Sequence, residues 1–250
     1  MKARKVRLTI PIFAFPSTLT VSNLCLGFLS ILASIRGDFL LAGWLIVSAA
    51  VLDGLDGLIA RATKSNSAFG LELDSLADAV SFATSTAILV ALWTERILGH
   101  LSPALGFLFM AAGLWRLARY NVLQAKQKDR TNYLGLTVPS AAVFIVSLIL
   151  NFSHSTALFI YHSLLWLAVI LVAFLMISRI RYPNFLSHRF WRHHGLRPGF
   201  LLALMASGLL FFPSLTLLIL TSVNVASGPL QEAWRLTRKF IWAKSPSQKS

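Results

Sequence analysis

Four aspartates stand at helical spacing in an otherwise apolar part of the chain. Together with small residues and one arginine they form a single register, Asp53-x2-Asp56-Gly57-x2-Ala60-Arg61-x8-Gly70-x3-Asp74-x3-Asp78. A carboxylate in apolar surroundings is costly unless it is paired or binds a cation. Because the ligands would all be oxygen atoms, the register predicts a hard cation, Mg²⁺ or Mn²⁺. Four carboxylates can hold two such ions, and paired metals are the recurring solution for displacement at phosphorus.

The register falls on two helices joined by a short segment. One face of the first helix carries Asp53, Asp56, Gly57 and Ala60, and one face of the second carries Gly70, Asp74 and Asp78. Since the connection at 62–69 is short, the two helices are predicted to be antiparallel neighbours with their carboxylates at similar depth. The small residues leave room for a ligand beside the backbone, although glycine and alanine at this spacing also serve plain helix packing. The adjacent Arg61 offers a guanidinium for a phosphate.

The elements that must position these residues are membrane helices. Of the 250 residues, 56% are hydrophobic and only 13% are charged, a profile that excludes a soluble globular protein. We therefore expect an all-α, polytopic helical bundle forming a single integral domain over residues 1–250, with a basic N-terminal segment at 1–14 and a basic tail at 227–250. Stretches long enough to cross the hydrocarbon core lie at about 18–36, 39–60, 73–93, 101–115, 138–152, 157–178 and 199–226.

The basic residues predict the orientation of these spans. If the stretch at 199–226 crosses twice, as short helices broken near Pro213, all of the 23 lysines and arginines except Arg36 and Arg96 fall on the cytoplasmic side. This predicts about eight spans in the cell inner membrane, with both termini cytoplasmic and the aspartates facing the cytoplasm. The formal charge of +14 is then explained by anionic membrane lipids, and nucleic acid is not expected as a partner. The tail from Leu230 to Trp242 mixes apolar and basic residues, which favours a position along the membrane surface.

The register resembles the signature of the CDP-alcohol phosphatidyltransferases, a family of integral membrane enzymes, at every motif position. Outside the register, the chain resembles the phosphatidylserine synthase branch of that family over about residues 15–185. Ser17 and Thr137 stand where that branch usually has Asn and Pro, which bears on the acceptor alcohol and not on the aspartates. The segments that carry the resemblance are Pro16-Ser17-x2-Thr20-x2-Asn23-Leu24-x-Leu26-Gly27-Phe28, Phe69 to Phe82, Trp115-Arg116-Leu117-Ala118-Arg119-Tyr120-Asn121, Gly135 to Ala142, and Ile180-Arg181-Tyr182-Pro183.

The resemblance implies a reaction and a role for each site residue. The phosphatidyl group of CDP-diacylglycerol would pass to the hydroxyl of L-serine, giving phosphatidylserine and CMP, with two divalent cations, Mg²⁺ or Mn²⁺, as cofactors. Asp78 would also act as general base toward the incoming hydroxyl. The metal ligands would be Asp53, Asp56, Asp74 and Asp78, and the contacts to the CDP-lipid would be Gly57, Ala60, Arg61, Gly70, Thr20 and Asn23.

The serine acceptor brings a carboxylate that needs a cationic partner. Arg116 and Arg119, one helical turn apart, are the natural partners, and Asn121 joins them as an acceptor contact. The two arginines can equally be read as charged anchors at the end of a span, and Asn121 as a helix cap. The acceptor therefore stays open between serine and a sister alcohol such as glycerol 3-phosphate, inositol or choline.

Two questions stay open, namely whether the protein is a transporter instead of an enzyme and whether it forms a homodimer. A cluster of carboxylates within a membrane also suits a cation transporter. Release of CMP separates the two classes, because a transporter would produce none. A homodimer is left open as a partner, and the membrane lipids are expected partners in either case.

Overall fold

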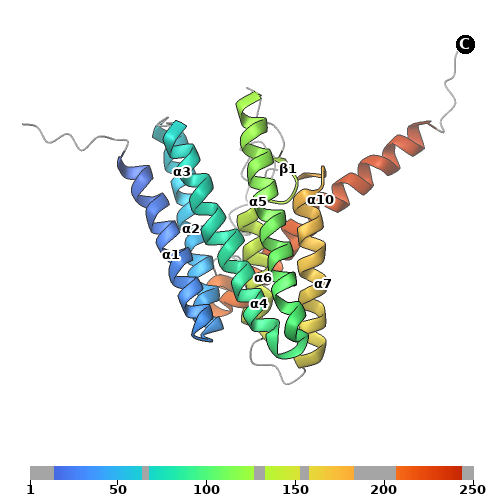
Figure 1. The fold of residues 1–250 in the computed structure, drawn as a ribbon. Coiled ribbons are helices and arrows are strands. Elements are labelled where there is room, and N and C mark those ends of the chain that lie inside the picture. The colour runs from blue at the N-terminus through green and yellow to red at the C-terminus, as the bar shows by residue number, and fades with distance from the viewer. Residues whose placement is uncertain (1–13, 64–67, 127–132, 153–157, 183–206, 244–250) are drawn as a thin grey trace, which may run out of the picture.

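The computed structural model describes residues 14–63, 68–126, 133–152, 158–182 and 207–243. Within them the chain is α-helical apart from one pairing of two short strands, so the all-α expectation holds at this level (Figure 1). The predicted basic segment at 1–14 lies almost wholly outside the described residues. The elements are α1 Ala14–Ile35, α2 Phe39–Thr63, α3 Ala68–Asp78, the π-helical η1 Ala79–Thr84, α4 Ser85–Leu98, the short η2 Gly99–Leu101, α5 Ser102–Lys126, β1 Tyr133–Leu134, α6 Val138–Phe152, α7 Leu158–Ile177, β2 Arg181–Tyr182 and α10 Pro213–Ala243.

Five helical segments in the described part are long and apolar enough to cross a membrane, which makes this a membrane helical protein. Two shorter apolar helices, Val138–Phe152 and Ser163–Ile177, accompany them. The span predicted at 101–115 was too short, because hydropathy falls at the arginines of α5 while the helix continues. The five segments are Thr18–Ile35, Phe39–Ile59, Phe69–Glu95, Gly99–Leu123 and Pro213–Arg235.

Local chemistry explains how the first two helices are joined. Gly37 has a φ of +79°, a left-handed conformation that suits glycine, and it forms the turn between α1 and α2. The carboxylate of Asp38 then accepts a hydrogen bond of 3.1 Å from the backbone N–H of Leu41 and caps the start of α2. The two helices can therefore pack against each other as an antiparallel pair.

A π-helical segment interrupts the third span directly after Asp78. Such a segment shifts the side-chain register of the helix that follows it, and it often lies at a functional site. Within it, the hydroxyl of Ser81 donates a hydrogen bond of 2.9 Å to the backbone carbonyl of Asn23. A Cβ atom at Gly27 would come within 2.5 Å of the Ser81 Oγ, so α1 reaches this close only because that residue is glycine. The sequence pattern did not predict this segment.

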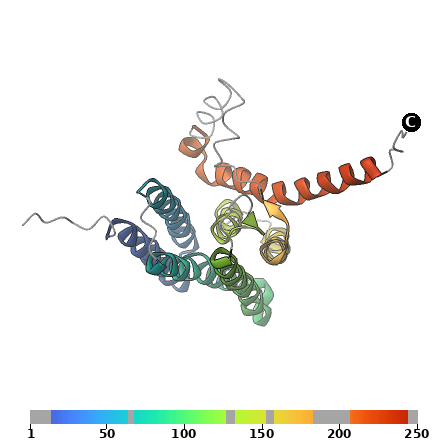
Figure 2. The same cartoon turned by 90° about the horizontal axis from the view of Figure 1, so that it is seen from above.

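The core lies where α2, α4, α5, α6 and α7 meet, and Figure 2 shows α10 running along one side of these helices. Large side chains such as Phe82, Phe109 and Met176 are fully buried there. Apolar side chains on the outside, among them Phe28 and Phe174, are more than half exposed, as expected of a surface that faces lipid.

The last helix joins the end of the predicted span at 199–226 to the predicted tail. A break does fall at Pro213, since residues 207–211 are helical and α10 begins at Pro213. From there α10 runs without interruption to Ala243, through Pro229. The predicted span and the predicted tail at 227–250 are thus joined by one helix, because one proline inside a helix removes a single hydrogen bond and need not end the helix. The first part of the predicted pair, 199–206, lies outside the described residues.

Candidate metal centre and transferase site

Three of the four motif aspartates come together between α2 and α3. Carboxylate oxygens of Asp53, Asp74 and Asp78 all lie within 4.8 Å of one another. The three side chains are half-buried, and the Oδ1 atom of Asp78 is buried without a hydrogen-bond partner. Uncompensated carboxylates at this distance repel one another, so the arrangement calls for a cation. An all-oxygen donor set with unsatisfied lone pairs fits a hard divalent cation such as Mg²⁺ or Mn²⁺.

The fourth aspartate, Asp56, lies deeper and is held by α1. It is 6% exposed, and its Oδ2 atom accepts a hydrogen bond of 2.6 Å from the hydroxyl of Thr20. Its Oδ1 atom is buried without a hydrogen-bond partner. Asp56 still interacts electrostatically with Asp53 and Asp74. The structure thus places Asp56 beside the group of three, and its role as a metal ligand stays a prediction.

Helix α1 supplies a second polar residue to the site. Asn23 is only 1% exposed, and neither its amide nitrogen nor its amide oxygen has a hydrogen-bond partner of normal geometry. Its side chain faces Asp78 across the interface between α1 and α3. Thr20 and Asn23 therefore each face one aspartate, Asp56 and Asp78 respectively. The sequence predicts that both residues contact the CDP-lipid, and that role stays a prediction.

The small residues of the register flank the aspartates, as their spacing requires. Gly57 follows Asp56 on α2, and Gly70 lies one turn before Asp74 on α3. Both glycines are partly exposed, so a ligand can reach their backbone. Ala60 and Arg61 belong to α2, but their side chains lie outside the described part of the chain. Contact of these four residues with a CDP-lipid remains a prediction.

Arg116 comes to the site from α5. It is 6% exposed and interacts electrostatically with Asp78. Its guanidinium carbon also lies 5.7 Å from the centre of the Tyr120 ring, within the range of a cation–π contact. A buried arginine beside the predicted general base is placed to meet an anionic group of a substrate.

The other two residues predicted to bind the acceptor make contacts with the protein. Arg119 donates hydrogen bonds of 2.6, 3.1 and 3.1 Å to the carbonyl oxygens of Ile177, Met176 and Ser178, at the C-terminal end of α7. These carbonyls lack partners within their own helix, and a cation also complements the helix dipole there.

Asn121 forms the second of these contacts. Its side-chain amide donates a hydrogen bond of 3.0 Å to the hydroxyl of Ser75, the residue after Asp74. Sequence reasoning missed Ser75 and the end of α7 as partners. The unsatisfied carbonyls at a helix end were a signal for some capping group, but nothing in the sequence said which arginine would supply it.

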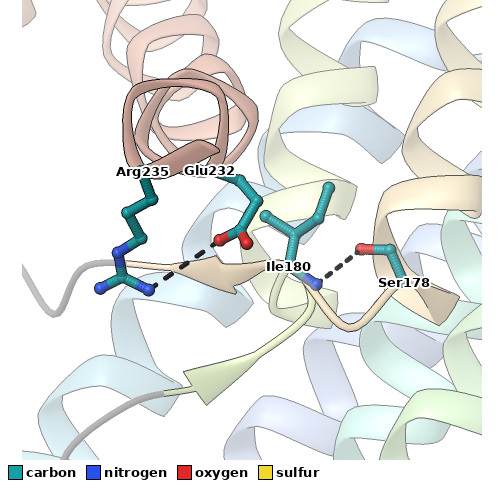
Figure 3. Close-up of polar contacts among 4 residues, drawn as sticks. All are labelled: Ser178, Ile180, Glu232 and Arg235. Atoms are coloured by element: carbon teal, nitrogen blue, oxygen red, sulfur yellow. Dashed lines mark hydrogen bonds and ion pairs between the residues drawn. The ribbon is translucent and has the colours of Figure 1, made fainter. Parts of the chain in front are cut away.

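Next to Arg119, the segment before α6 pairs with the segment after α7. The backbone N–H of Gly135 donates a hydrogen bond of 2.8 Å to the carbonyl of Ile180. The two strands then pair antiparallel, Tyr133 opposite Tyr182 and Leu134 opposite Arg181. Gly135 has a φ of +78°, and a Cβ atom there would lie 2.7 Å from a guanidinium nitrogen of Arg119. The segment that follows α7 adds a hydrogen bond of 3.4 Å from the N–H of Ile180 to the hydroxyl of Ser178 (Figure 3).

A helical membrane protein with an acidic, oxygen-only centre suits an enzyme that uses divalent metals. The chain belongs to the CDP-alcohol phosphatidyltransferase family, which matches residues 13–177. The matched region contains every predicted site residue and ends before β2 and α10.

Three relatives with known names are similar to the chain over most of its length. A CDP-diacylglycerol–serine O-phosphatidyltransferase of Helicobacter pylori (strain ATCC 700392 / 26695) is 36% identical over 182 residues, covering 70% of this chain and 74% of that protein. An archaetidylserine synthase of Methanothermobacter thermautotrophicus is 38% identical, with 68% of this chain and 70% of that protein covered. A CDP-diacylglycerol–serine O-phosphatidyltransferase of Bacillus subtilis (strain 168) is 30% identical, with 69% and 92% covered.

Proposed function

We propose that this protein transfers the phosphatidyl group of CDP-diacylglycerol to the hydroxyl of L-serine, giving phosphatidylserine and CMP in phospholipid biosynthesis. The observation that carries the proposal is the convergence of Asp53, Asp74 and Asp78 beside the buried Arg116. The carboxylates suit the metals that a pyrophosphate requires, and the guanidinium suits the carboxylate of serine.

In the proposed reaction, Asp53, Asp74 and Asp78, with Asp56 beside them, hold two divalent cations, Mg²⁺ or Mn²⁺. When bound, these ions would neutralise the pyrophosphate of the CDP-lipid and the charge that develops on the leaving phosphate. The small Gly57, Gly70 and Ala60 leave space for the nucleotide, and Arg61 with the α1 face of Thr20 and Asn23 completes the CDP-lipid site.

Asp78 acts on the acceptor. Its carboxylate takes the proton of the serine hydroxyl, the freed oxygen attacks the phosphorus on the lipid side, and the bond from that phosphorus to the bridging oxygen breaks so that CMP leaves. A serine hydroxyl is a poor nucleophile at neutral pH, and a positioned general base contributes roughly 10²–10⁴-fold to such a step. Arg116 binds the serine carboxylate, and we place Arg119 and Asn121 around this pocket as residues that fix the position of α5.

Serine is favoured over a sister acceptor by what the relatives' names have in common. The Helicobacter and Bacillus proteins are named for serine and CDP-diacylglycerol, and the Methanothermobacter protein is named for serine on an archaeal lipid. The acceptor is therefore the constant element in these names, while the lipid varies. A buried arginine beside Asp78 is also better matched to a carboxylate than to the neutral hydroxyls of inositol.

We also propose that the chain crosses the inner membrane eight times with both termini in the cytoplasm. The side chain of Asn151, at the end of α6, donates a hydrogen bond of 2.8 Å to the carbonyl of Ser214 near the start of α10. Tyr182, in contrast, lies at the other end of the bundle beside the start of α6 and α10 residue Val225. Tyr182 and Ser214 thus lie at opposite ends of the bundle, which supports the proposed count of eight.

The experiment is an acceptor panel with the purified protein in lipid nanodiscs. CDP-diacylglycerol and its ether-linked analogue would each be offered with L-serine, glycerol 3-phosphate, inositol and choline, while CMP and the lipid product are measured. The expected result is metal-dependent release of CMP with L-serine and formation of phosphatidylserine. A higher kcat/KM with another alcohol would overturn serine as the acceptor. Absence of CMP with every alcohol would overturn the transferase chemistry and favour the transporter alternative.

A further inference from the structure

The C-terminal helix α10 has two halves in different surroundings. Its first half runs beside α6 in the opposite direction, with Ser214 near Asn151 and the hydroxyl of Thr221 3.5 Å from that of Ser147. Its second half leaves the other helices, as both views show (Figures 1 and 2). None of this helix lies in the part of the chain that matches the family, so the proposed function gives it no role.

Tyr182 contacts α10 at the point where this helix leaves the bundle. Pro229 has no N–H, so the carbonyl of Val225, four residues earlier, loses its partner within the helix. The hydroxyl of Tyr182 donates a hydrogen bond of 3.3 Å to that carbonyl. A Cβ atom at Gly228 would lie 2.6 Å from the Tyr182 ring, so only glycine lets the helix pack this close. Burial raises the pKa of Tyr182 to about 12, so it remains a hydrogen-bond donor at neutral pH.

Beyond this point the helix is amphipathic. At about 100° per residue, Leu230, Trp234 and Ile241 share one side with Leu236 and Phe240, while the opposite side carries the basic residues Arg235, Arg238 and Lys239. Leu230 is 66% exposed and Trp234 is 64% exposed, so within the described part of the chain most of this apolar surface is open.

The polar side of the same helix is open to water. The ion pair of 3.9 Å between Arg235 and Glu232 lies there, with each side chain more than 40% exposed (Figure 3). Such a pair contributes little to stability. In the sequence of this stretch, Ser227–Ala243, Glu232 is the only acidic residue beside Arg235, Arg238 and Lys239.

The geometry points to an interfacial helix: we propose that α10 beyond Gly228 lies on the membrane and binds anionic lipid headgroups at the end of the bundle that holds the candidate site. Two features of the molecule indicate that anionic lipid covers this helix. The helix leaves the bundle beside Tyr182, at the end of the bundle that holds the candidate site, and this supports a position of its exposed apolar side at the lipid boundary. Its other side is basic, and each lysine or arginine near an anionic surface strengthens binding about fivefold.

The test uses the fact that Cys25 is the only cysteine of the chain. In a Cys25→Ser background, Leu230→Cys on the apolar side and the neighbouring Gln231→Cys on the polar side would each carry an environment-sensitive fluorophore. The full-length protein would be reconstituted in phosphatidylcholine vesicles with and without phosphatidylglycerol. In the anionic vesicles, we expect the label at position 230 to be quenched by a lipid-borne quencher and the label at 231 by aqueous iodide.

Charge reversal completes the experiment. Arg235→Glu, Arg238→Glu and Lys239→Glu together should return the label at position 230 to water in the anionic vesicles. Equal iodide quenching at 230 and 231 before charge reversal would overturn the proposal, because the helix would then project into water. Equal lipid quenching at both positions would also overturn it, because the span would continue past Pro229. Protection of position 230 in detergent that rises with protein concentration would identify a second copy of the chain as the occupant instead.

Discussion

The candidate site has two walls, one formed by α2 and α3 (the aspartate wall) and the other by α5. These walls use their polar side chains in different ways. On α2 and α3, Asp53, Asp74 and Asp78 bring carboxylate oxygens to within 4.8 Å of one another. On α5, Arg119 and Asn121 donate hydrogen bonds to α7 and α3. The difference teaches that a polar residue near a site binds a ligand or builds the fold according to whether the protein already satisfies it.

Arg116 also lies on α5, but its surroundings differ from those of Arg119. It is buried beside Asp78 while Arg119, one turn later, reaches away to the end of α7. Two arginines that were equivalent in the sequence thus have separate surroundings. The predictions below test whether this division between the two walls governs activity.

The largest effect is expected on the aspartate wall. Asp53→Asn and Asp74→Asn should each lower kcat by about 10³-fold or more, because each removes a metal ligand and the several kcal/mol of charge stabilisation that the metal supplies. The measurement is CMP release across a titration of Mg²⁺ and Mn²⁺. Near-normal turnover of either variant in EDTA would remove the metal centre from the proposal.

Asp78→Asn should lower kcat by roughly 10²-fold or more through loss of the general base, with a smaller loss in binding of CDP-diacylglycerol. Single-turnover kinetics and a separate binding measurement with the lipid nucleotide distinguish the two effects. If nucleotide affinity falls as much as the rate, Asp78 is chiefly a metal ligand and another group takes the proton.

The two arginines give a matched pair on the other wall. Arg116→Ala should raise the KM for L-serine about tenfold or more, since the loss of one charge-assisted contact costs about 1.5–3 kcal/mol. Arg119→Ala should instead lower the thermal midpoint of the protein, because three carbonyls of α7 lose their donor. If Arg119→Ala raises the KM for serine with no loss of stability, the assignment of Arg119 to the fold and not to the acceptor is wrong.

The smallest effect is expected for the contact between Asn121 and Ser75. Asn121→Ala should lower the free energy of unfolding by about 0.5–1.5 kcal/mol, the usual contribution of a neutral hydrogen bond. Ser75→Ala removes the same bond from the other side, so the double variant should cost little more than either single variant. Thermal denaturation in detergent measures all three. A KM for serine that rises in Asn121→Ala but not in Ser75→Ala would return Asn121 to the acceptor site.

Much of the candidate site could be predicted from the sequence because its signals are local. Helical periodicity puts Asp53 on one face of α2 and both Asp74 and Asp78 on one face of α3, and a short connection brings those helices together. Apolar runs gave the membrane helices, and their ends were missed only where charged residues continue a helix, as at Arg116. The sequence by itself therefore determined the family, the membrane helices of the described part and the three carboxylates that meet.

The tertiary structure decided which partner each polar residue has. Arg119 bonds to the end of α7 at sequence separations of 57 to 59 residues. Thr20 bonds to Asp56 at a separation of 36 residues. Tyr182 meets the carbonyl of Val225, left open by Pro229, across 43 residues. No local pattern records such pairs, because they depend on how the helices pack and on the glycines that let them approach. The sequence thus supplied the groups, and the packing of the helices determined which of them remain to bind a ligand.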